Sequence, residues 1–542
     1  MNKKDLYRAI GNIDDEYTVV KRRNNGTVNH ENIEVVNEAE GGNAMVVSVR
    51  RRKILPHLLA AVLILAVGVS VAVAVGTGLQ KDNDINDETI QNEEIADENE
   101  ELIEENHDED TQNEDASDDM IPDDDNMNGQ ASCIYEMNPD TGEYELVFVC
   151  TDENNTVPEF AEDFQNPEVI PWSVETALDE ISDYLMETNN LDTRDHGTVM
   201  FANGGYRLYL TTDRKLQTYL DDKYKDWYYF PESLSNEGDM IQSAIAVMDY
   251  EGHILGVEGK IGEKAAEDNR GFNFAYEGGR HIGSAITPVT VYGYAVENGL
   301  LTPETEFYDE PLSLGIIPDV DYWPRNFDGA PSGGYYPAKY FFKQSINTLP
   351  AQILYNNGNS LVEEIYDFAT KKLHLDLEPE DADYAPLAMG WTYTGPGLIN
   401  LANAYMPYGN GGRYYKASII SRLEDAETGE ILIDNENRDY EQAVSEETAY
   451  IMNDMLSEVI RNGTGTAASL ENAPVAGKTG AVEDWRDLTF VGLTPDYVSA
   501  MWIGYDLGGN SWAIESINSA GLWKNVFGDY ADENWSGASF PK

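Results

Sequence analysis

Residues 476–506 read AGKTGAVEDWRDLTFVGLTPDYVSAMWIGYD, and this stretch decides the fold. Its second part, 488–505, is typical of a β-hairpin. Another hairpin is predicted at 243–258, where the runs SAIAVMD and ILGVE bracket a turn at 250–253. The first strand of that hairpin is almost uninterrupted in apolar residues, as expected of a central sheet strand. Two hairpins so far apart in the chain can bring distant strands into one sheet.

A serine precedes a predicted helix between these hairpins. Residues 272–288 read FNFAYEGGRHIGSAITP, and the following residues place Val289, Tyr292 and Val296 on one helical face. The hydroxyl group of Ser284 would then lie near the positive end of the helix dipole. Taken alone, this pattern favours an ordinary N-cap serine.

Two short motifs follow Ser284 along the chain. The first is Ser345-Ile346-Asn347, and the second is Lys478-Thr479-Gly480 at the head of the strand hairpin. Each motif is common by chance, since another Ser-x-Asn occurs at 516–518. Their order and context, however, resemble those of penicillin-binding proteins and serine β-lactamases.

From about residue 204 to about 508, the chain resembles the transpeptidase half of class A penicillin-binding proteins. The phrases that carry the resemblance are FNFAYEGGRHIGSAITP, YWPRNFDG at 322–329, GNGGRYY at 409–415, VIRNGTGTAA at 459–468 and TFVGLTPDYVSAMWIGYD. The resemblance implies an α+β fold in which a five-stranded antiparallel sheet is flanked by helices. A glycosyltransferase half is not expected, because residues 82–200 are too short and too acidic to hold one.

The resemblance also implies acyl transfer through a covalent intermediate. Ser284 would be the nucleophile that attacks the D-Ala-D-Ala bond of peptidoglycan stem peptides, or a β-lactam. The backbone N–H groups of Ser284 and Ala481 would form the oxyanion hole. Neither a metal nor an organic cofactor is implied.

The other motif residues would bind the substrate and move protons. Ser345 would relay a proton to the leaving amine, and Asn347 would hydrogen-bond the substrate amide. Lys478 and Thr479, with Gly480, would hold the terminal carboxylate of the substrate, and Lys478 and Thr479 would also shape the proton network.

Two positions depart from the family pattern. Thr287 stands where the Ser-x-x-Lys motif has its lysine, and a threonine hydroxyl cannot act as a base near neutral pH. Ala481 stands where the family usually has Thr or Ser after Lys-Thr-Gly. Lys478 is the obvious substitute for the missing base, and His281 is a weaker one. The site is therefore expected to be impaired or inactive.

Three hypotheses about function remain open. The first is a D,D-transpeptidase or carboxypeptidase that acts on wall peptides. The second is a pseudoenzyme that binds the wall and positions other cell-wall synthases. The third is a sensor of β-lactams or wall fragments, because residues 1–23 loosely resemble the short tails of membrane-bound anti-sigma-like proteins.

Composition excludes several other classes of function. The 542 residues include 99 Asp and Glu against 35 Lys and Arg, and the net charge of −64 would repel nucleic acid. Two cysteines and seven scattered histidines make a dedicated metal site unexpected.

The charge pattern divides the chain into segments. The run 58–75 contains 18 residues without a charge and follows four basic residues at 50–53, which predicts a single-pass anchor with a cytoplasmic N-terminus. Residues 82–127 hold 22 Asp and Glu but no Lys or Arg, which predicts an extended spacer. The expected parts are listed in chain order: a cytoplasmic tail at 1–53, a transmembrane helix at 54–78, a disordered acidic spacer at 79–130, a small N-terminal ectodomain at 131–240 and a transpeptidase-like domain at 241–542.

A further hairpin is predicted at 133–150, CIYEMNPDTGEYELVFVC. A two-residue loop at Thr141 and Gly142 would place Cys133 opposite Cys150, and a disulfide bond between them is expected outside the membrane. A four-residue loop would shift that register and leave two free thiols.

Overall fold

The computed structural model describes residues 32–38, 44–50, 129–151, 155–230, 240–313, 322–326, 331–436, 438–482, 485–505 and 518–542. The expected anchor at 54–78 and nearly all of the expected spacer at 79–130 lie outside these ranges. Among the residues that are described, no helix has both the length and the apolar character needed to cross a bilayer.

The chain divides into two units, Met1–Ala116 and Ser117–Lys542. In the first unit, β1 (Asn32–Glu38) and β2 (Ala44–Arg50) form an antiparallel hairpin. All other elements that the structure describes belong to the second unit.

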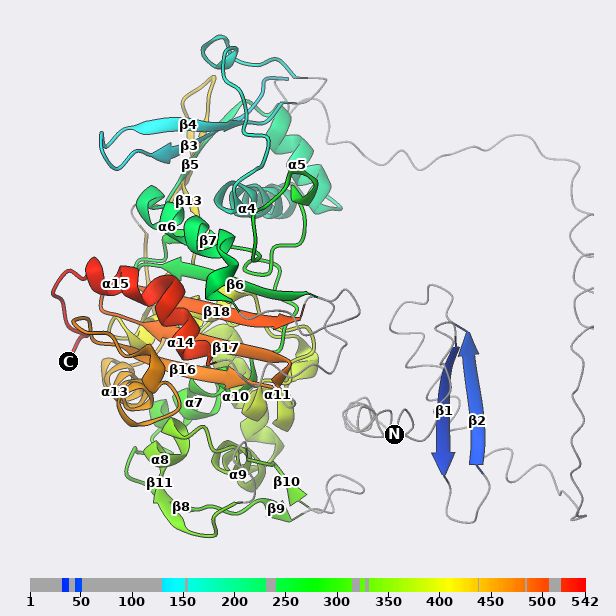
Figure 1. Ribbon diagram of the computed structural model, residues 1–542, viewed down its shortest axis with the longest axis vertical. Helices are drawn as coiled ribbons and strands as arrows, with labels where there is room; N and C mark the ends of the chain where they lie inside the picture. Colours follow the sequence, from blue (N-terminus) through cyan, green and yellow to red (C-terminus); the bar gives the residue numbers. More distant parts are fainter. Residues whose placement is uncertain are drawn as a thin grey trace, which may run out of the picture. The chain divides into compact units, whose positions relative to one another are not determined.

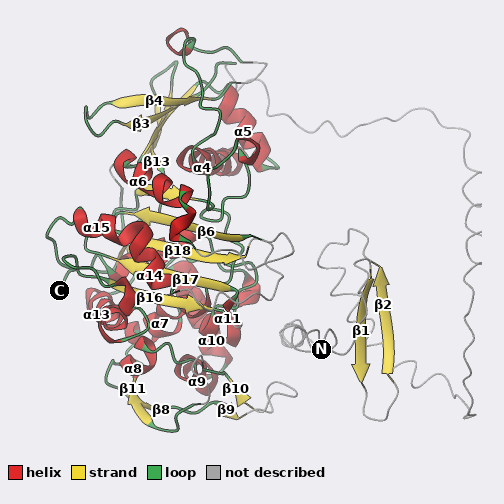
Figure 2. Ribbon diagram, in the orientation of Figure 1, coloured by secondary structure: helices red, strands yellow, loops and turns green. Residues whose placement is uncertain are grey.

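A five-stranded antiparallel sheet forms the body of the second unit, as predicted (Figures 1 and 2). Its strands, in spatial order, are β16 (Ala476–Ala481), β17 (Asp487–Leu493), β18 (Val498–Tyr505), β6 (Ile241–Met248) and β7 (Ile254–Glu258). The two hairpins join between β18 and β6, where Trp502 pairs with Ala244. All of β6 is buried, which confirms that it is a central strand, and β16 is an edge strand.

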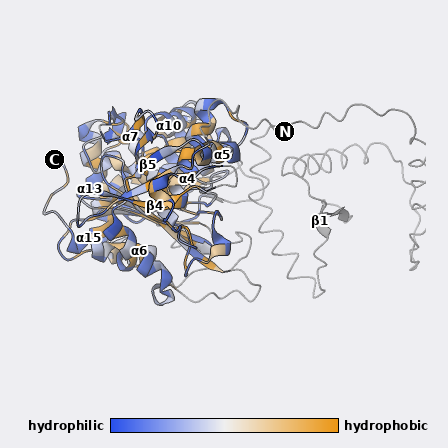
Figure 3. Ribbon diagram, turned by 90° about the horizontal axis from the view of Figure 1, so that it is seen from above, coloured by the Kyte–Doolittle hydropathy of each residue, from blue (hydrophilic) through white to orange (hydrophobic). Residues whose placement is uncertain are grey.

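Alternate residues of β6 face two hydrophobic cores. Ala244 and Ala246 contribute to the larger core, whereas Ile245 and Val247 contribute to the smaller one. The smaller core is covered by α6 (Arg214–Lys225), α14 (Ser519–Trp523) and α15 (Asp529–Glu533), which cross the near face of the sheet in Figure 1. The outer helices α6 and α15 are coloured mostly hydrophilic in Figure 3, as expected of surface helices.

The larger core lies on the other face of the sheet. Helices that contribute side chains to it include α7 (Val291–Glu297), α8 (Ala338–Lys343), α9 (Thr348–Asn357), α10 (Asn359–Lys371), α11 (Tyr384–Met389), α12 (Leu398–Tyr405) and α13 (Glu446–Asn462). Short strand pairs accompany them: β8 (Glu306–Tyr308) with β11 (Tyr335–Pro337), β9 (Leu312–Ser313) with β10 (Tyr322–Trp323), and β12 (Arg413–Tyr414) with β15 (Glu441–Gln442).

A second five-stranded sheet lies on the N-terminal side of this body. Its strands, in spatial order, are β14 (Ile431–Asp434), β13 (Ile420–Asp425), β5 (Tyr206–Leu210), β3 (Cys133–Met137) and β4 (Tyr144–Val149). Only β3 and β5 run parallel to each other. The sheet thus combines strands from both sides of residue 240, the boundary expected from sequence.

Two helices lie between Trp172 and Asn203. Asn190 adopts a left-handed conformation and ends α4 (Trp172–Asn189). Thr193 then caps α5 (Arg194–Asn203) by accepting a hydrogen bond from the backbone N–H of His196. Residues 199–203 are therefore helical.

The hairpin at 133–150 is confirmed, but the disulfide prediction is wrong. The backbone N–H of Asn138 bonds the carbonyl of Glu143, which leaves a four-residue loop between them. With this loop alone Cys133 would lie opposite Phe148, and a bulge beside Ile134 moves it opposite Val149, still one residue short of Cys150. Both cysteines are free and buried. Burial raises the pKa of Cys150 to about 12, which disfavours the reactive thiolate.

We therefore expect the purified protein to contain two free thiols. Denaturing it without a reductant should release two groups that react with a thiol reagent, and Cys133→Ser should leave one. In the folded protein both should react slowly, because the cysteine residues are only 1% and 7% exposed. Thiols that appear only after reduction would contradict the observed register.

Candidate active site

Three chain segments converge at Ser284 because glycines allow close backbone approach. Gly283 has φ +57°, and a Cβ atom there would lie 2.4 Å from the carbonyl oxygen of Ala481 on β16. Gly390, just after α11, has φ +70°, and its Cβ atom would lie 2.1 Å from the carbonyl oxygen of Gly283. Side chains at these positions would be strained and would also clash. The start of the Ser284 segment is thus fixed between β16 and α11.

The predicted helix after Ser284 is interrupted. Residues Gly283–Val289 form a 3₁₀ helix containing Pro288, and α7 begins only after Thr290. Carbonyl groups in this stretch bond to buried tyrosines: Tyr405 donates to Ala285, and Tyr408 donates to Pro288 over 2.7 Å. These bonds satisfy carbonyl groups that an uninterrupted α-helix would pair internally.

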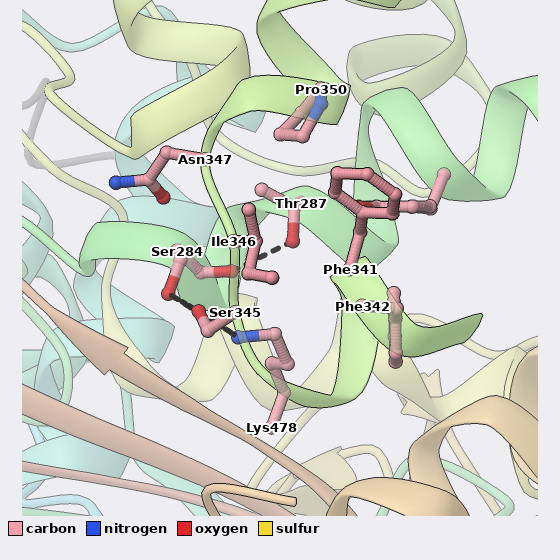
Figure 4. A pocket seen from close by; sticks show the side chains of 10 residues that line it. Ser284, Thr287, Phe341, Phe342, Ser345, Ile346, Asn347, Pro350 and Lys478 are labelled. Atoms are coloured by element: carbon pink, nitrogen blue, oxygen red, sulfur yellow. Dashed lines mark hydrogen bonds between the residues drawn. The ribbon is translucent and has the colours of Figure 1, made fainter. Parts of the chain in front are cut away.

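Ser284, Ser345 and Lys478 form one hydrogen-bonded group, which we call the Ser–Ser–Lys group (Figure 4). The two serine Oγ atoms are 2.7 Å apart. Lys478 Nζ lies 2.8 Å from Ser345 Oγ and 3.3 Å from Ser284 Oγ. The structure thus brings together residues from the 3₁₀ helix, the loop between α8 and α9, and the edge strand β16.

Lys478 is almost fully buried, with 1% of its surface exposed. Burial lowers its pKa to about 7, because an ammonium ion loses its solvation inside the protein. Its Nζ also donates a hydrogen bond to the carbonyl oxygen of Thr479, 2.8 Å away. An amine with this pKa is neutral in a large fraction of molecules at pH 7, so it can accept a proton from a nearby hydroxyl group.

The Thr287 hydroxyl bonds to the backbone rather than to the nucleophilic hydroxyl of Ser284. Its hydroxyl donates to the backbone carbonyl of Ser284 over 2.9 Å, and the residue is 3% exposed. It borders a small cavity beside the Ser–Ser–Lys group. The residues lining this cavity are Ser284, Thr287, Tyr292, Phe341, Phe342, Ser345, Ile346, Asn347, Pro350 and Lys478.

Asn347 lies at the same cavity and is held by a neighbouring loop. Its backbone N–H donates to Asn326 Oδ1 over 3.0 Å, and its Nδ2 atom donates to the carbonyl of Arg325 over 2.8 Å. In Figure 4 its amide points away from Lys478. Its expected contact with a substrate amide stays a prediction.

The remaining motif residues lie along β16. Thr479 Oγ1 is 2.6 Å from Thr464 Oγ1, a partner that sequence reasoning missed although Thr464 lies in the phrase VIRNGTGTAA. A Cβ atom on Gly480 would lie 2.0 Å from the carbonyl oxygen of Ile282, so this position also requires glycine. The oxyanion-hole role of Ala481 stays a prediction.

His281, the weaker substitute for the missing base, is exposed and does not line the cavity. The geometry therefore favours Lys478 as the group that can accept the proton of Ser284.

Comparison with known proteins agrees with this geometry. Residues 243–506 match the family model of the penicillin-binding protein transpeptidase domain. Penicillin-binding protein 1A of Clostridium botulinum (strain Langeland) is 29% identical over 368 residues, which cover 66% of this chain and 43% of the relative.

Solved structures share the fold. The penicillin-binding protein PonA1 from Mycobacterium tuberculosis aligns with a TM-score of 0.54 and 20% identity, over 69% of this chain and 95% of that one. The D,D-transpeptidase domain of a peptidoglycan glycosyltransferase from Eggerthella lenta aligns with a TM-score of 0.51 and 18% identity, over 75% and 99% of the two chains.

Residues 243–506 thus share the fold and the order of motifs of the penicillin-binding protein transpeptidase domain. The findings support the conclusion that this chain is a transpeptidase-domain protein related to the class A penicillin-binding proteins. It spans less than half the length of the Clostridium botulinum relative.

Proposed function

We propose that this chain is a membrane-anchored, extracytoplasmic domain whose Ser284 is acylated slowly by peptidoglycan stem peptides and β-lactams. The observation that carries the proposal is the Ser–Ser–Lys group, in which the buried amine of Lys478 lies 3.3 Å from Ser284 Oγ. A structure of PonA1, which shares the fold, was obtained in complex with penicillin V.

The reaction begins when the neutral amine of Lys478 accepts the proton of Ser284, directly or through Ser345. Ser284 Oγ then bonds to the carbonyl carbon of the substrate, and negative charge develops on the carbonyl oxygen. As the tetrahedral intermediate collapses, the C–N bond breaks. The proton held by Lys478 passes through Ser345 to the leaving nitrogen, which leaves an acylated serine and a neutral lysine.

The reaction is slow because one amine performs the work of two. In the family motif a second lysine stands where this chain has Thr287. The Thr287 hydroxyl donates its hydrogen to a backbone carbonyl and supplies no base. General acid–base catalysis contributes about 10²–10⁴-fold to a rate, and part of that contribution is lost here.

Anchoring is proposed from the sequence alone. The 18-residue uncharged run at 58–75 is long enough for a membrane span when its apolar flanks are included, and the basic residues at 50–53 favour a cytoplasmic N-terminus. The acidic stretch at 82–127 would then separate the folded part from the membrane.

The test is covalent labelling of the full-length protein by a fluorescent penicillin, followed by denaturing electrophoresis. We expect slow labelling of the native protein and none of Ser284→Ala. The control is Ser360→Ala on α10, an exposed serine that bonds Glu364 outside the site. Absence of labelling in the native protein, or equal labelling of Ser284→Ala, would leave a binding scaffold or sensor as the function.

The labelling rate should rise with pH. Because the base must be neutral, the rate should increase about tenfold per pH unit below the pKa of Lys478, which lies at about 7, and level off above it. Pre-steady-state labelling between pH 5.5 and 9 measures this profile. A flat profile would show that Lys478 is not the base.

A further inference from the structure

One hydroxyl group beside the active site has no evident partner. Tyr292, on α7, is 2% exposed, and its Oη atom is buried without a hydrogen-bond partner among the residues that the structure describes. An unsatisfied buried hydroxyl group is destabilising, and most buried polar atoms in folded proteins are paired. The neighbouring tyrosines Tyr405 and Tyr408 follow this rule, because both donate to backbone carbonyls.

Tyr292 lines the same cavity as the Ser–Ser–Lys group. The cavity has a volume of about 10 Å³ for the centre of a water-sized sphere, which is room for one water molecule. The Tyr292 ring packs edge-on against Phe342, with ring centroids 4.9 Å apart, so the direction of its hydroxyl group is fixed by packing.

Polar groups border this cavity from three other segments. Thr287 uses its hydrogen for the Ser284 carbonyl and keeps its oxygen lone pairs available. Ser345 and Lys478 also line the cavity, and their Oγ and Nζ atoms are hydrogen-bonded to each other beside Ser284. A buried water usually makes about three hydrogen bonds, and Thr287, Ser345 and Lys478 each line this cavity and carry a polar side-chain atom.

We propose that the cavity is a binding site for one water molecule, which accepts a hydrogen bond from Tyr292 and bridges it to the Ser–Ser–Lys group. Tyr292 is then a positioning residue that acts on Lys478 through the water. The water takes the place of the amine that the family motif would supply from position 287. The catalytic consequence rests on the proposed acylation of Ser284, whereas the water site itself does not.

The water affects both the position and the charge of Lys478. Once Lys478 has accepted the proton of Ser284, the water accepts an N–H bond from the ammonium group and stabilises it. No charged side chain in the described ranges contributes to the pKa of Lys478, so the effect of the water is not masked by an ion pair. Loss of the Tyr292 hydroxyl should therefore disfavour the protonated amine.

The test compares Tyr292→Phe with the native full-length protein. We expect the plateau rate of fluorescent-penicillin labelling to fall about fivefold, the equivalent of one hydrogen bond. The midpoint of the pH–rate profile should also move about 0.5 unit lower. The control is Tyr250→Phe, which removes a tyrosine hydroxyl that bonds Thr494 away from the site. An unchanged rate and midpoint in Tyr292→Phe would overturn the positioning role.

Two measurements test for the bound water independently of the acylation of Ser284. A crystal structure should show an ordered water within hydrogen-bond distance of Tyr292 Oη. Thermal unfolding of Tyr292→Phe should begin at a lower temperature, because the water loses a donor. A cavity without a water, together with an unchanged or raised melting temperature, would mean that the hydroxyl is simply unsatisfied and would overturn the site. If the native protein is never labelled, the proposed function fails, and these two results alone decide the water site.

Discussion

Replacing Lys478 by methionine is expected to lower the rate of Ser284 acylation by about 10²–10⁴-fold, which is the usual contribution of a general base. Methionine keeps the length and apolar stem of the lysine side chain but has no proton acceptor of comparable strength. Because the native amine is buried and partly neutral near pH 7, its replacement by an apolar side chain should leave the fold intact. The time course of fluorescent-penicillin labelling measures the loss.

The matched control is Lys343→Met on α8. Lys343 lies 3.9 Å from Glu458 and does not line the active-site cavity. Its replacement should leave the labelling rate within about twofold of native, since a partly exposed ion pair contributes little. If Lys478→Met retains a rate close to native, another group must deprotonate Ser284.

The second large effect is a gain. Thr287→Lys should raise the labelling rate at least about tenfold, because it places a second amine beside Ser284 and restores the family motif. The new side chain enters a cavity with room for about one water, so overpacking should cost about 1–3 kcal/mol of stability. The labelling rate should therefore rise while the melting temperature falls.

The Thr287→Met variant separates the effect of the added amine from the effect of the added side-chain volume. Methionine adds a comparable length without a base, so it should lower stability in the same way and should not raise the labelling rate. Equal rates for Thr287→Lys, Thr287→Met and the native protein would show that the amine at this position does not limit acylation. The proposed reason for slow turnover would then be wrong.

The body of the fold could be predicted because two hairpins carry clear local signals. The apolar run of β6 and the phrase that forms β17 and β18 predict strands independently of context, and the structure pairs β6 with β18. The register of the hairpin at 133–150 could not be predicted with the same security. The loop length and a bulge beside Ile134 together decide which residue faces Cys133, and no sequence signal identified the bulge.

The motif residues could be identified from sequence, but the chemistry of the site could not. Lys478 and Ser284 are 194 residues apart, and the low pKa of Lys478 arises from burial where three segments meet. Tyr292 is recognisable from sequence only as one member of an apolar helical face. Its unpaired hydroxyl and its place in the cavity depend on the packing of segments that are distant in the chain.

The second sheet has a mechanical consequence. Strand β3 lies inside that sheet, hydrogen-bonded to β4 on one side and to β5 on the other, and β5 is bonded to β13. A pull on the chain ahead of residue 133 is therefore resisted by two rows of backbone hydrogen bonds rather than by one exposed edge. Since β13 comes from 420–425, the load passes directly into a distant part of the chain. A tether attached there would transmit tension into the sheet before β3 itself could peel away.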